Sequence, residues 1–117
     1  MDTRTKIVPS EEAARLAAGG AVVVSGYFDP LLAAHADRLR ELKGSGARLL
    51  VAIADPPNPI LPVRARAELV AGLAVVDHVV ESVDGLTPGT RLEQEDEQRL
   101  RELIAHVHAR QSAASSS

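Results

Sequence analysis

The sequence predicts a small Rossmann-like α/β fold, a three-layer αβα sandwich with a mostly parallel sheet. Two apolar runs, residues 21–24 and 48–54, do not alternate with polar residues, which is typical of strands that helices cover on both faces. Segments with apolar residues at helical spacing separate such runs, which favours βαβ units and parallel pairing. A chain of 117 residues can bury one core, so we expect one domain over residues 1–111 and a disordered tail of small residues over 112–117.

The first element expected is a short helix that ends near Ala18. Ser10, Glu11 and Glu12 begin it, and the two acids are placed favourably against the helix dipole. The glycine pair at residues 19–20 then ends the helix.

A strand that turns into a helix is expected next, over residues 21–35. Residues 21–24 form the strand, and Gly26 lets the backbone turn. Asp29 can cap free N–H groups, and Pro30 suits a first helical position, where no N–H donor is needed. The N-terminus of a helix that follows a parallel strand is the usual place for a phosphate in an open α/β fold.

The second half of the predicted βαβ unit follows directly. Apolar residues at helical spacing over 32–42 continue the helix, and the Gly-Ser-Gly turn at residues 44–46 stops it. Residues 48–54 form the second buried strand. Three prolines within residues 55–59 then predict a stiff loop that leaves the carboxyl end of the sheet, the side on which such folds bind ligands.

The remaining elements are two helices and a strand. Pro62 begins a helix, and residues 75–81, Val-Val-Asp-His-Val-Val-Glu, form a third strand. Four acids within residues 93–97 begin the last helix. The apolar face of that helix consists of Leu100, Leu103, Ile104 and Val107.

Composition excludes several classes of function. The chain has no cysteine, which rules out disulfides and a thiol nucleophile and is compatible with a reducing cytoplasm. No apolar run is as long as a membrane span, and the first residues lack a signal-peptide core. Acids and bases are interspersed with a formal net charge of −3, which offers no basic surface for nucleic acid. We therefore expect a soluble cytoplasmic protein that binds neither membranes nor nucleic acid.

No metal site is expected from the histidines. His106 and His108 are two residues apart on a helix and so point to different faces. His78 lies in a strand and points the opposite way from Asp77.

The ten residues from Gly26 to His35 read Gly-Tyr-Phe-Asp-Pro-Leu-Leu-Ala-Ala-His. They resemble the first signature of the HIGH-type nucleotidyltransferases, the cytidylyltransferase-like superfamily, whose pattern is G-x-F-D-x-x-H-x-G-H. Leu32 stands where the first histidine of that pattern belongs, and Ala34 stands where its glycine belongs. The residues that match are Gly26, Phe28, Asp29 and His35.

The resemblance continues beyond the signature. Lys43 and Gly46 match a basic residue and a glycine turn of the family, and residues 48–50 match the Arg-Leu start of its next strand. Residues 66–69 resemble its Arg-Ala-Glu stretch, and residues 76–80 resemble its Val-Asp-x-Val-Val strand.

In all, the resemblance covers about residues 6–88, and the nearest relatives look like heptose 1-phosphate adenylyltransferase domains and glycerol-3-phosphate cytidylyltransferases. Nothing after Thr90 resembles the family's further strand or its late Ser/Thr-rich signature. We therefore expect a fold truncated relative to the family, with a sheet edge that must be covered or paired.

The resemblance implies an enzyme that transfers CMP or AMP from CTP or ATP, with Mg²⁺, to a small phosphorylated alcohol or sugar and releases pyrophosphate. On this reading His35 and Lys43 are the catalytic residues, which steady the phosphates. The nucleotide-binding residues that it implies are Gly26, Tyr27, Phe28, Asp29, His35 and Arg66.

Most of these residues also have a structural interpretation. His35 can be a half-buried helix residue near a turn, and Lys43 can serve the dipole of a last helical turn. Capping alone would explain Asp29, and Arg66 can be a solvated helix arginine.

Three functions stay open on the sequence alone. The chain can be an active nucleotidyltransferase, or a degenerate relative with weak or no turnover, which the replacements at Leu32 and Ala34 favour. It can also be a non-catalytic structural or regulatory protein that forms a homo-oligomer, such as a dimer, through its sheet edge or last helix.

Overall fold

The computed structural model describes residues 2–115, with the side chains of all of these except residue 99 and residues 106–115. It confirms the predicted α/β class, because the sheet has four strands, all parallel, in the order β3-β2-β1-β4. The strands are β1 (Val22–Gly26), β2 (Leu49–Ile53), β3 (His78–Val80) and β4 (Thr90–Arg91).

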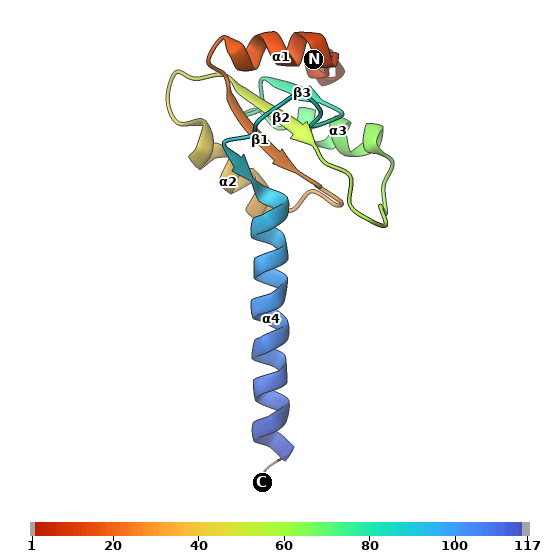
Figure 1. Ribbon diagram of the computed structural model, residues 1–117, viewed down its shortest axis with the longest axis vertical. Coiled ribbons are helices and arrows are strands. Elements are labelled where there is room, and N and C mark those ends of the chain that lie inside the picture. Colours follow the sequence, from red (N-terminus) through yellow and green to blue (C-terminus); the bar gives the residue numbers. More distant parts are fainter. Residues whose placement is uncertain (1, 116–117) are drawn as a thin grey trace.

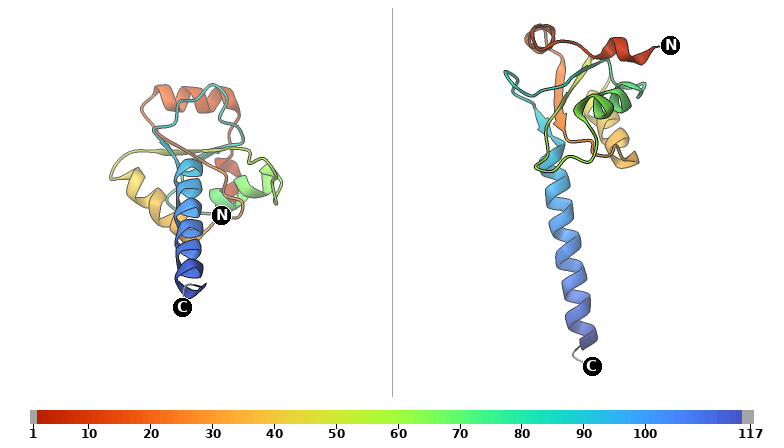
Figure 2. Two further views of the ribbon diagram at one scale, coloured as in Figure 1. Left: turned by 60° about the horizontal axis from the view of Figure 1, so that its bottom comes forward. Right: turned by 90° about the vertical axis from the view of Figure 1, so that its right-hand side faces the viewer.

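Helices cover both faces of the sheet. A 3₁₀ turn, η1 (Thr3–Lys6), precedes α1 (Ser10–Ala18), which lies on one face. The other face carries α2 (Ala33–Lys43) and α3 (Val63–Ala71) (Figure 1, Figure 2). The three predicted layers are therefore present.

Burial of β2 on both faces explains why its sequence does not alternate. Leu49, Val51 and Ile53 belong to the core beneath α2 and α3, whereas Leu50 and Ala52 belong to the core beneath α1. All five side chains are buried, so each face of the strand needs apolar residues.

The last helix, α4 (Leu92–Ser115), follows β4 without a loop and projects away from the α/β body (Figure 1). The molecule consequently measures 59 × 30 × 29 Å. The predicted start of this helix at the acidic run is confirmed. Residues 112–115 of the expected tail continue the helix, while residues 116–117 and the side chain of Val107 lie outside the described part.

Two strands differ from the prediction. β3 spans His78–Val80 rather than residues 75–81, because the carboxylate of Asp77 accepts the Leu49 N–H at 2.7 Å in place of a strand partner. The edge of β1, which we expected to be covered or paired, is paired by the two-residue strand β4. The first difference shortens β3, and the second adds a fourth strand to the three that were predicted.

In the part of the chain that the structure describes, no helix has both the length and the apolar character needed to cross a bilayer.

Candidate functional site

The candidate site lies at the carboxyl end of β1, where the chain turns towards α2. Gly26 ends β1, and Phe28 adopts a left-handed backbone conformation with φ of 49°. The buried ring of Phe28 folds back over Gly26, where a Cβ atom would lie 2.7 Å from the ring carbon Cε2. Gly26 is therefore required by the close packing of this ring.

Asp29 does not begin α2, contrary to our expectation. Its carboxylate accepts the Ile60 N–H at 2.6 Å and the Leu61 N–H at 2.8 Å, and α2 begins at Ala33 after the N-cap residue Leu32. Two charge-assisted bonds to the loop outweigh one capping bond. Asp29 thus ties the turn after β1 to the proline-rich loop after β2.

His35 lies in the first turn of α2 and is 4% exposed. Its Nδ1 accepts the Leu32 N–H at 3.0 Å, so the ring proton stands on Nε2. Nε2 lies 2.9 Å from Oδ2 of Asp96, a residue of α4, and donates its proton there. The ring also packs edge-on against Phe28, with 5.4 Å between centroids. Both ring nitrogens of His35 therefore have protein partners.

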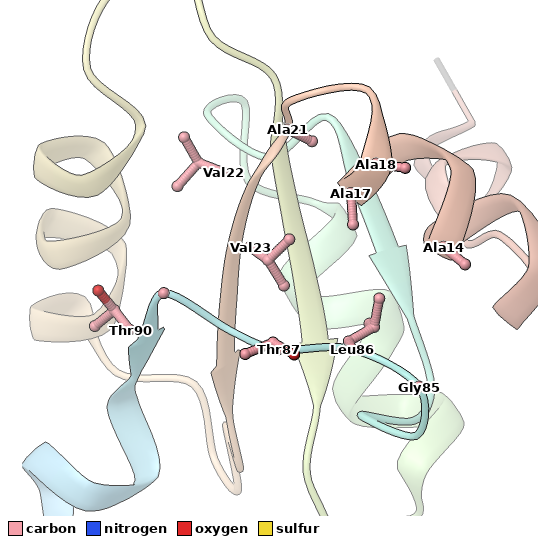
Figure 3. Close-up of a pocket in the computed structure, with 11 residues that line it drawn as sticks. Ala14, Ala17, Ala18, Ala21, Val22, Val23, Gly85, Leu86, Thr87 and Thr90 are labelled. Atoms are coloured by element: carbon pink, nitrogen blue, oxygen red, sulfur yellow. The ribbon is translucent and has the colours of Figure 1, made fainter.

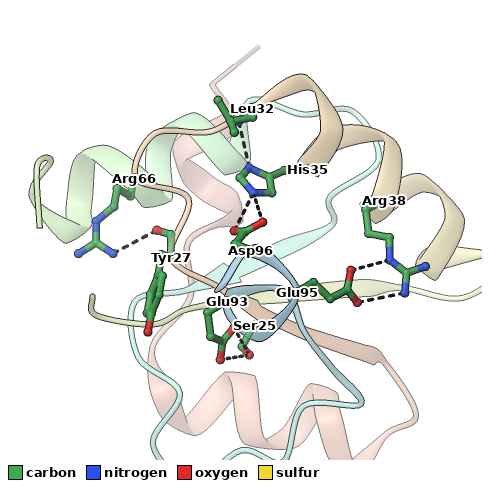
Figure 4. A network of polar contacts seen from close by, with 9 residues as sticks. All are labelled: Ser25, Tyr27, Leu32, His35, Arg38, Arg66, Glu93, Glu95 and Asp96. Atoms are coloured by element: carbon green, nitrogen blue, oxygen red, sulfur yellow. Dashed lines mark hydrogen bonds and ion pairs between the residues drawn. The ribbon is translucent and has the colours of Figure 1, made fainter. Parts of the chain in front are cut away.

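Two further carboxylates from the start of α4 meet the same region (Figure 4). The hydroxyl of the fully buried Ser25 lies 2.9 Å from both carboxylate oxygens of Glu93. Arg38 donates two hydrogen bonds of 3.1 Å to Glu95 in a bidentate pair. Together with Asp96, these acids fasten α4 to the end of β1 and to the first turns of α2.

Arg66 is not a solvated helix arginine. Its side chain is 1% exposed and donates to the carbonyl oxygens of Ala54 (2.8 Å), Leu61 (3.0 Å) and Tyr27 (3.2 Å). The remaining guanidinium nitrogen pairs with Asp55 at 3.1 Å. Arg66 therefore joins the ends of β1 and β2 to the loop, and its donors are used within the fold.

The phenol of Tyr27 lies close to the acids of α4. Burial raises the pKa of Tyr27, and the negative charges of Glu97 and Glu93 raise it further. The hydroxyl is protonated at neutral pH, as in an ordinary tyrosine, and can serve as a hydrogen-bond donor.

Lys43 is not near His35. It ends α2, and its ammonium group donates to the Val75 carbonyl at 3.2 Å and to Asp77 at 3.0 Å. Asp77 also accepts the N–H of Leu49, the first residue of β2, so this cluster marks the amino end of the sheet. His35 and Lys43 therefore lie at opposite ends of α2.

The cluster at the amino end changes the acidity of Asp77. Burial acts to raise the pKa of this carboxyl, but the hydrogen bond from Leu49 and the ammonium of Lys43 outweigh it. The net effect lowers the pKa of Asp77 below its ordinary value of 3.8.

A groove of about 770 Å³ opens beside His35. Its walls come from the turn after β1, from the proline-rich loop and from the side of α4 that carries Leu100 and Leu103. Apolar groups make up most of the surface, with Asn58, Asp29 and Asp96 among its polar residues. Such a groove accommodates an apolar group more readily than a polyphosphate.

A second cavity, of about 550 Å³, lies on the α1 face of the sheet (Figure 3). Its walls come from α1, from the start of β1 and from residues 85–90, and none of its residues is charged. It therefore offers no charged side chain for a charge-assisted hydrogen bond to an anion.

Metal ligands do not converge within the described residues, where no group of three His, Cys, Asp or Glu side chains could hold an ion. His78, for example, has Arg48 Nη1 at 3.3 Å from its Nε2.

Sequence reasoning missed Ser25, Arg38 and Asp96 as members of the site. Four acids within residues 93–97 were interpreted only as a helix start. That is more negative charge than a helix dipole of about half a unit charge needs, and this excess was the available signal for partners elsewhere.

Comparison with known proteins shows homology to the bifunctional protein HldE of several bacteria. The chain is 34% identical to the HldE of Shewanella piezotolerans over 87 residues, which is 67% of this chain. It is 35% identical to that of Chromohalobacter salexigens over 83 residues and 38% identical to that of Pseudomonas fluorescens over 82 residues, or 63% and 62% of this chain. The matches span only 17–18% of the length of these relatives. No family profile matches the chain.

Proposed function

The chain belongs to the HIGH-type nucleotidyltransferase superfamily through its homology to HldE, and on that basis we propose that it is a degenerate nucleotidyltransferase-like protein. In this proposal its ancestors transferred CMP or AMP from a nucleoside triphosphate to a small phosphorylated alcohol or sugar, and this chain has weak or no turnover. We also propose a cytoplasmic location, with which the absence of cysteine is compatible.

The observation that carries the proposal is the contact between His35 and Asp96. A histidine that assists phosphate transfer must direct its free N–H towards the phosphate oxygens. Here the N–H on Nε2 is donated to a carboxylate 2.9 Å away, and Nδ1 is used by the Leu32 N–H. An acid of the protein thus takes the position that a phosphate oxygen would need.

The charges near His35 also disfavour the binding of a nucleotide. Glu93, Glu95 and Asp96 lie at the end of β1 and along the first two turns of α2, and Arg38 is the cation that pairs with Glu95. A triphosphate retains negative charge even with Mg²⁺ bound, so these carboxylates repel it. A Mg²⁺–nucleotide therefore fits the observed arrangement poorly.

The two replacements in the signature support the proposal as well. The side chain of Leu32 is 51% exposed at the groove and cannot donate a hydrogen bond to a phosphate. Ala34 adds a methyl group where the family's glycine leaves the backbone bare for the nucleotide.

Calorimetric titration with ATP and CTP, with and without Mg²⁺, tests the proposal. We expect no saturable binding by the wild-type chain up to about millimolar nucleotide, and no pyrophosphate release with glycerol 3-phosphate or a sugar 1-phosphate. Micromolar binding that His35→Ala abolishes, together with pyrophosphate release, would show an active enzyme instead.

A pair of variants separates the two proposed causes of lost nucleotide binding, which are the replaced signature residues and the carboxylates of α4. Leu32→His with Ala34→Gly restores the signature but keeps the carboxylates, so we expect it to remain without nucleotide binding. Adding Glu93→Gln and Asp96→Asn removes the negative charges next to Ser25 and His35, and this variant should gain measurable binding. Equal binding by both variants would mean that the acids of α4 do not block the site.

The alternative, a structural or regulatory protein that acts through protein contacts, is favoured by one observation. Leu100, Leu103 and Ile104 are 57%, 59% and 48% exposed on the projecting helix α4. Exposed aliphatic side chains that lie next to one another are typical of an interaction surface.

A further inference from the structure

The exposed apolar side chains of α4 form one continuous surface, which we term the α4 face: Leu100, Leu103 and Ile104. Their spacing of three and four residues places them on the same side of the helix. Asp96, one turn earlier, points to His35, so the α4 face begins at the candidate site and runs outwards along the helix. Figure 1 shows that this part of α4 has left the α/β body.

The α4 face continues onto the body through the groove of about 770 Å³. Leu100 and Leu103 line this groove on one side. Leu32, 51% exposed, and Ile60, 78% exposed, line it from the turn after β1 and from the proline-rich loop. Contiguous apolar surface of this kind is uncommon on a monomer unless it binds something.

The charges of α4 indicate what it binds. Residues 92–98 contain four acids and no base, whereas residues 99–111 contain three arginines and one glutamate. Glu95 is paired with Arg38 within the fold, so a second helix meets the net charge of the start of α4 rather than four free acids. Two α4 helices that run antiparallel place the acidic part of each opposite the basic part of the other. A parallel pair places acids opposite acids. Charge complementarity therefore favours a second copy in the antiparallel orientation.

The dimensions of the helix agree with this orientation. α4 spans residues 92–115, so its midpoint lies between Leu103 and Ile104, in the α4 face itself. The first turn of α4 is held against the body by Glu93 and Asp96, so an antiparallel pair centred there can be in contact from about residue 97 to residue 110, about 21 Å. The last residues of each α4 then lie beside the groove of the other copy, between Leu32 and Ile60.

We propose that the α4 face binds the α4 face of a second copy of this chain in an antiparallel helix pair. The proposal goes beyond the proposed function and does not depend on it. Six apolar side chains from the two copies form the centre of the contact, and the groove beside His35 receives the end of the partner's helix.

Sedimentation equilibrium of the full chain tests the pairing. We expect a dimer at micromolar concentration and a loss of affinity of at least about 100-fold for Leu103→Glu. The matched control is Leu69→Glu, since Leu69 is 47% exposed on α3, outside the α4 face. A wild-type monomer at several hundred micromolar, or a Leu103→Glu variant that dimerises as the wild type does, would overturn the proposal.

Disulfide trapping tests the orientation, because the chain has no cysteine of its own. In the antiparallel pair, the two copies of Leu103→Cys lie almost opposite each other and should cross-link. The two copies of Leu100→Cys are separated by about 10 Å along the axis, beyond the roughly 7 Å between Cα atoms that a disulfide allows. Cross-linking of both variants would indicate a parallel pair, and cross-linking of neither would rule out the α4 face; both results contradict the proposal.

Discussion

The two sides of the carboxyl end of β1 are closed in different ways. On the side of α3, Arg66 donates to backbone carbonyls of Tyr27, Ala54 and Leu61. On the side of α2, His35 donates to the side-chain carboxylate of Asp96. A backbone carbonyl moves only when the fold moves, whereas a carboxylate on α4 can be removed by one substitution. We therefore call Arg66 and the closely packed Gly26 the frame of the site, because their contacts are fixed by the fold. On the His35 side, by contrast, a single substitution can change which ligands the site binds.

Arg66→Met should give the largest effect, because it leaves the buried carbonyl oxygen of Ala54 and the partly buried carbonyl oxygens of Leu61 and Tyr27 without their donors. We expect a loss of about 3 kcal/mol in the free energy of unfolding, measured by urea denaturation. The control, Arg64→Met, removes an arginine that is 53% exposed and should cost no more than about 1 kcal/mol. Equal losses would mean that Arg66 is not part of the frame.

Gly26→Ala tests the other residue of the frame. The added Cβ would meet the Phe28 ring at 2.7 Å and displace it, so we expect a loss of about 2 kcal/mol in the same measurement. At Gly89 an added Cβ meets only the Val23 carbonyl oxygen at 3.8 Å, an ordinary contact. Gly89→Ala should therefore be close to neutral, and a similar cost at both positions would contradict the packing argument.

Asp96→Asn tests the side of the site that α4 closes. The variant loses a charge but keeps an oxygen for His35, so we expect a loss of only about 1 kcal/mol in unfolding free energy. Its main effect should be that inorganic phosphate raises the melting temperature of the variant but not that of the wild type. Asp84→Asn, in an exposed turn, is the control. If phosphate stabilises neither protein, the His35 side is not an anion site.

The smallest effect is expected at the amino end of the sheet. The pKa of Asp77 is lower in the folded chain than in the unfolded chain. The ionised carboxylate therefore contributes fully to the free energy of unfolding above the unfolded pKa of about 4, and this contribution is lost as the pH falls through the folded pKa. Thermal unfolding at pH 5, 4 and 3 should show the wild type losing more stability than Asp77→Asn, by about 1 kcal/mol or less. Parallel pH profiles would mean that Asp77 contributes nothing through its charge.

The sequence predicted those parts of the fold that rest on local pattern. The apolar runs of β1 and β2 are predictable because both faces of each strand are buried. The starts of α1 and α4 are predictable because acids at a helix N-terminus are a local signal. The homology to HldE confirms the superfamily that the stretch from Gly26 to His35 indicated.

The contacts of the candidate site were not predictable in the same way. Asp29 has the residue type of a helix cap, but its partners Ile60 and Leu61 lie 31 and 32 residues later. An arginine on a helix is usually solvated, and only the convergence of two strand ends on Arg66 buries it.

Distance along a helix decided the placement of the two expected catalytic residues. His35 and Lys43 fall in one resembling stretch, but about 12 Å of helix separates them, so they meet different ends of the sheet. The Asp96 partner of His35 is 61 residues away in sequence.

The projecting helix also changes the size of the particle in solution. The Cα radius of gyration is 16.6 Å, whereas a compact chain of this length has about 13 Å. Scattering at low angle therefore distinguishes an extended α4 from one folded back on the body, without any label. The same helix makes the chain tumble more slowly about its short axes than about its long axis, so nuclear spin relaxation should be anisotropic.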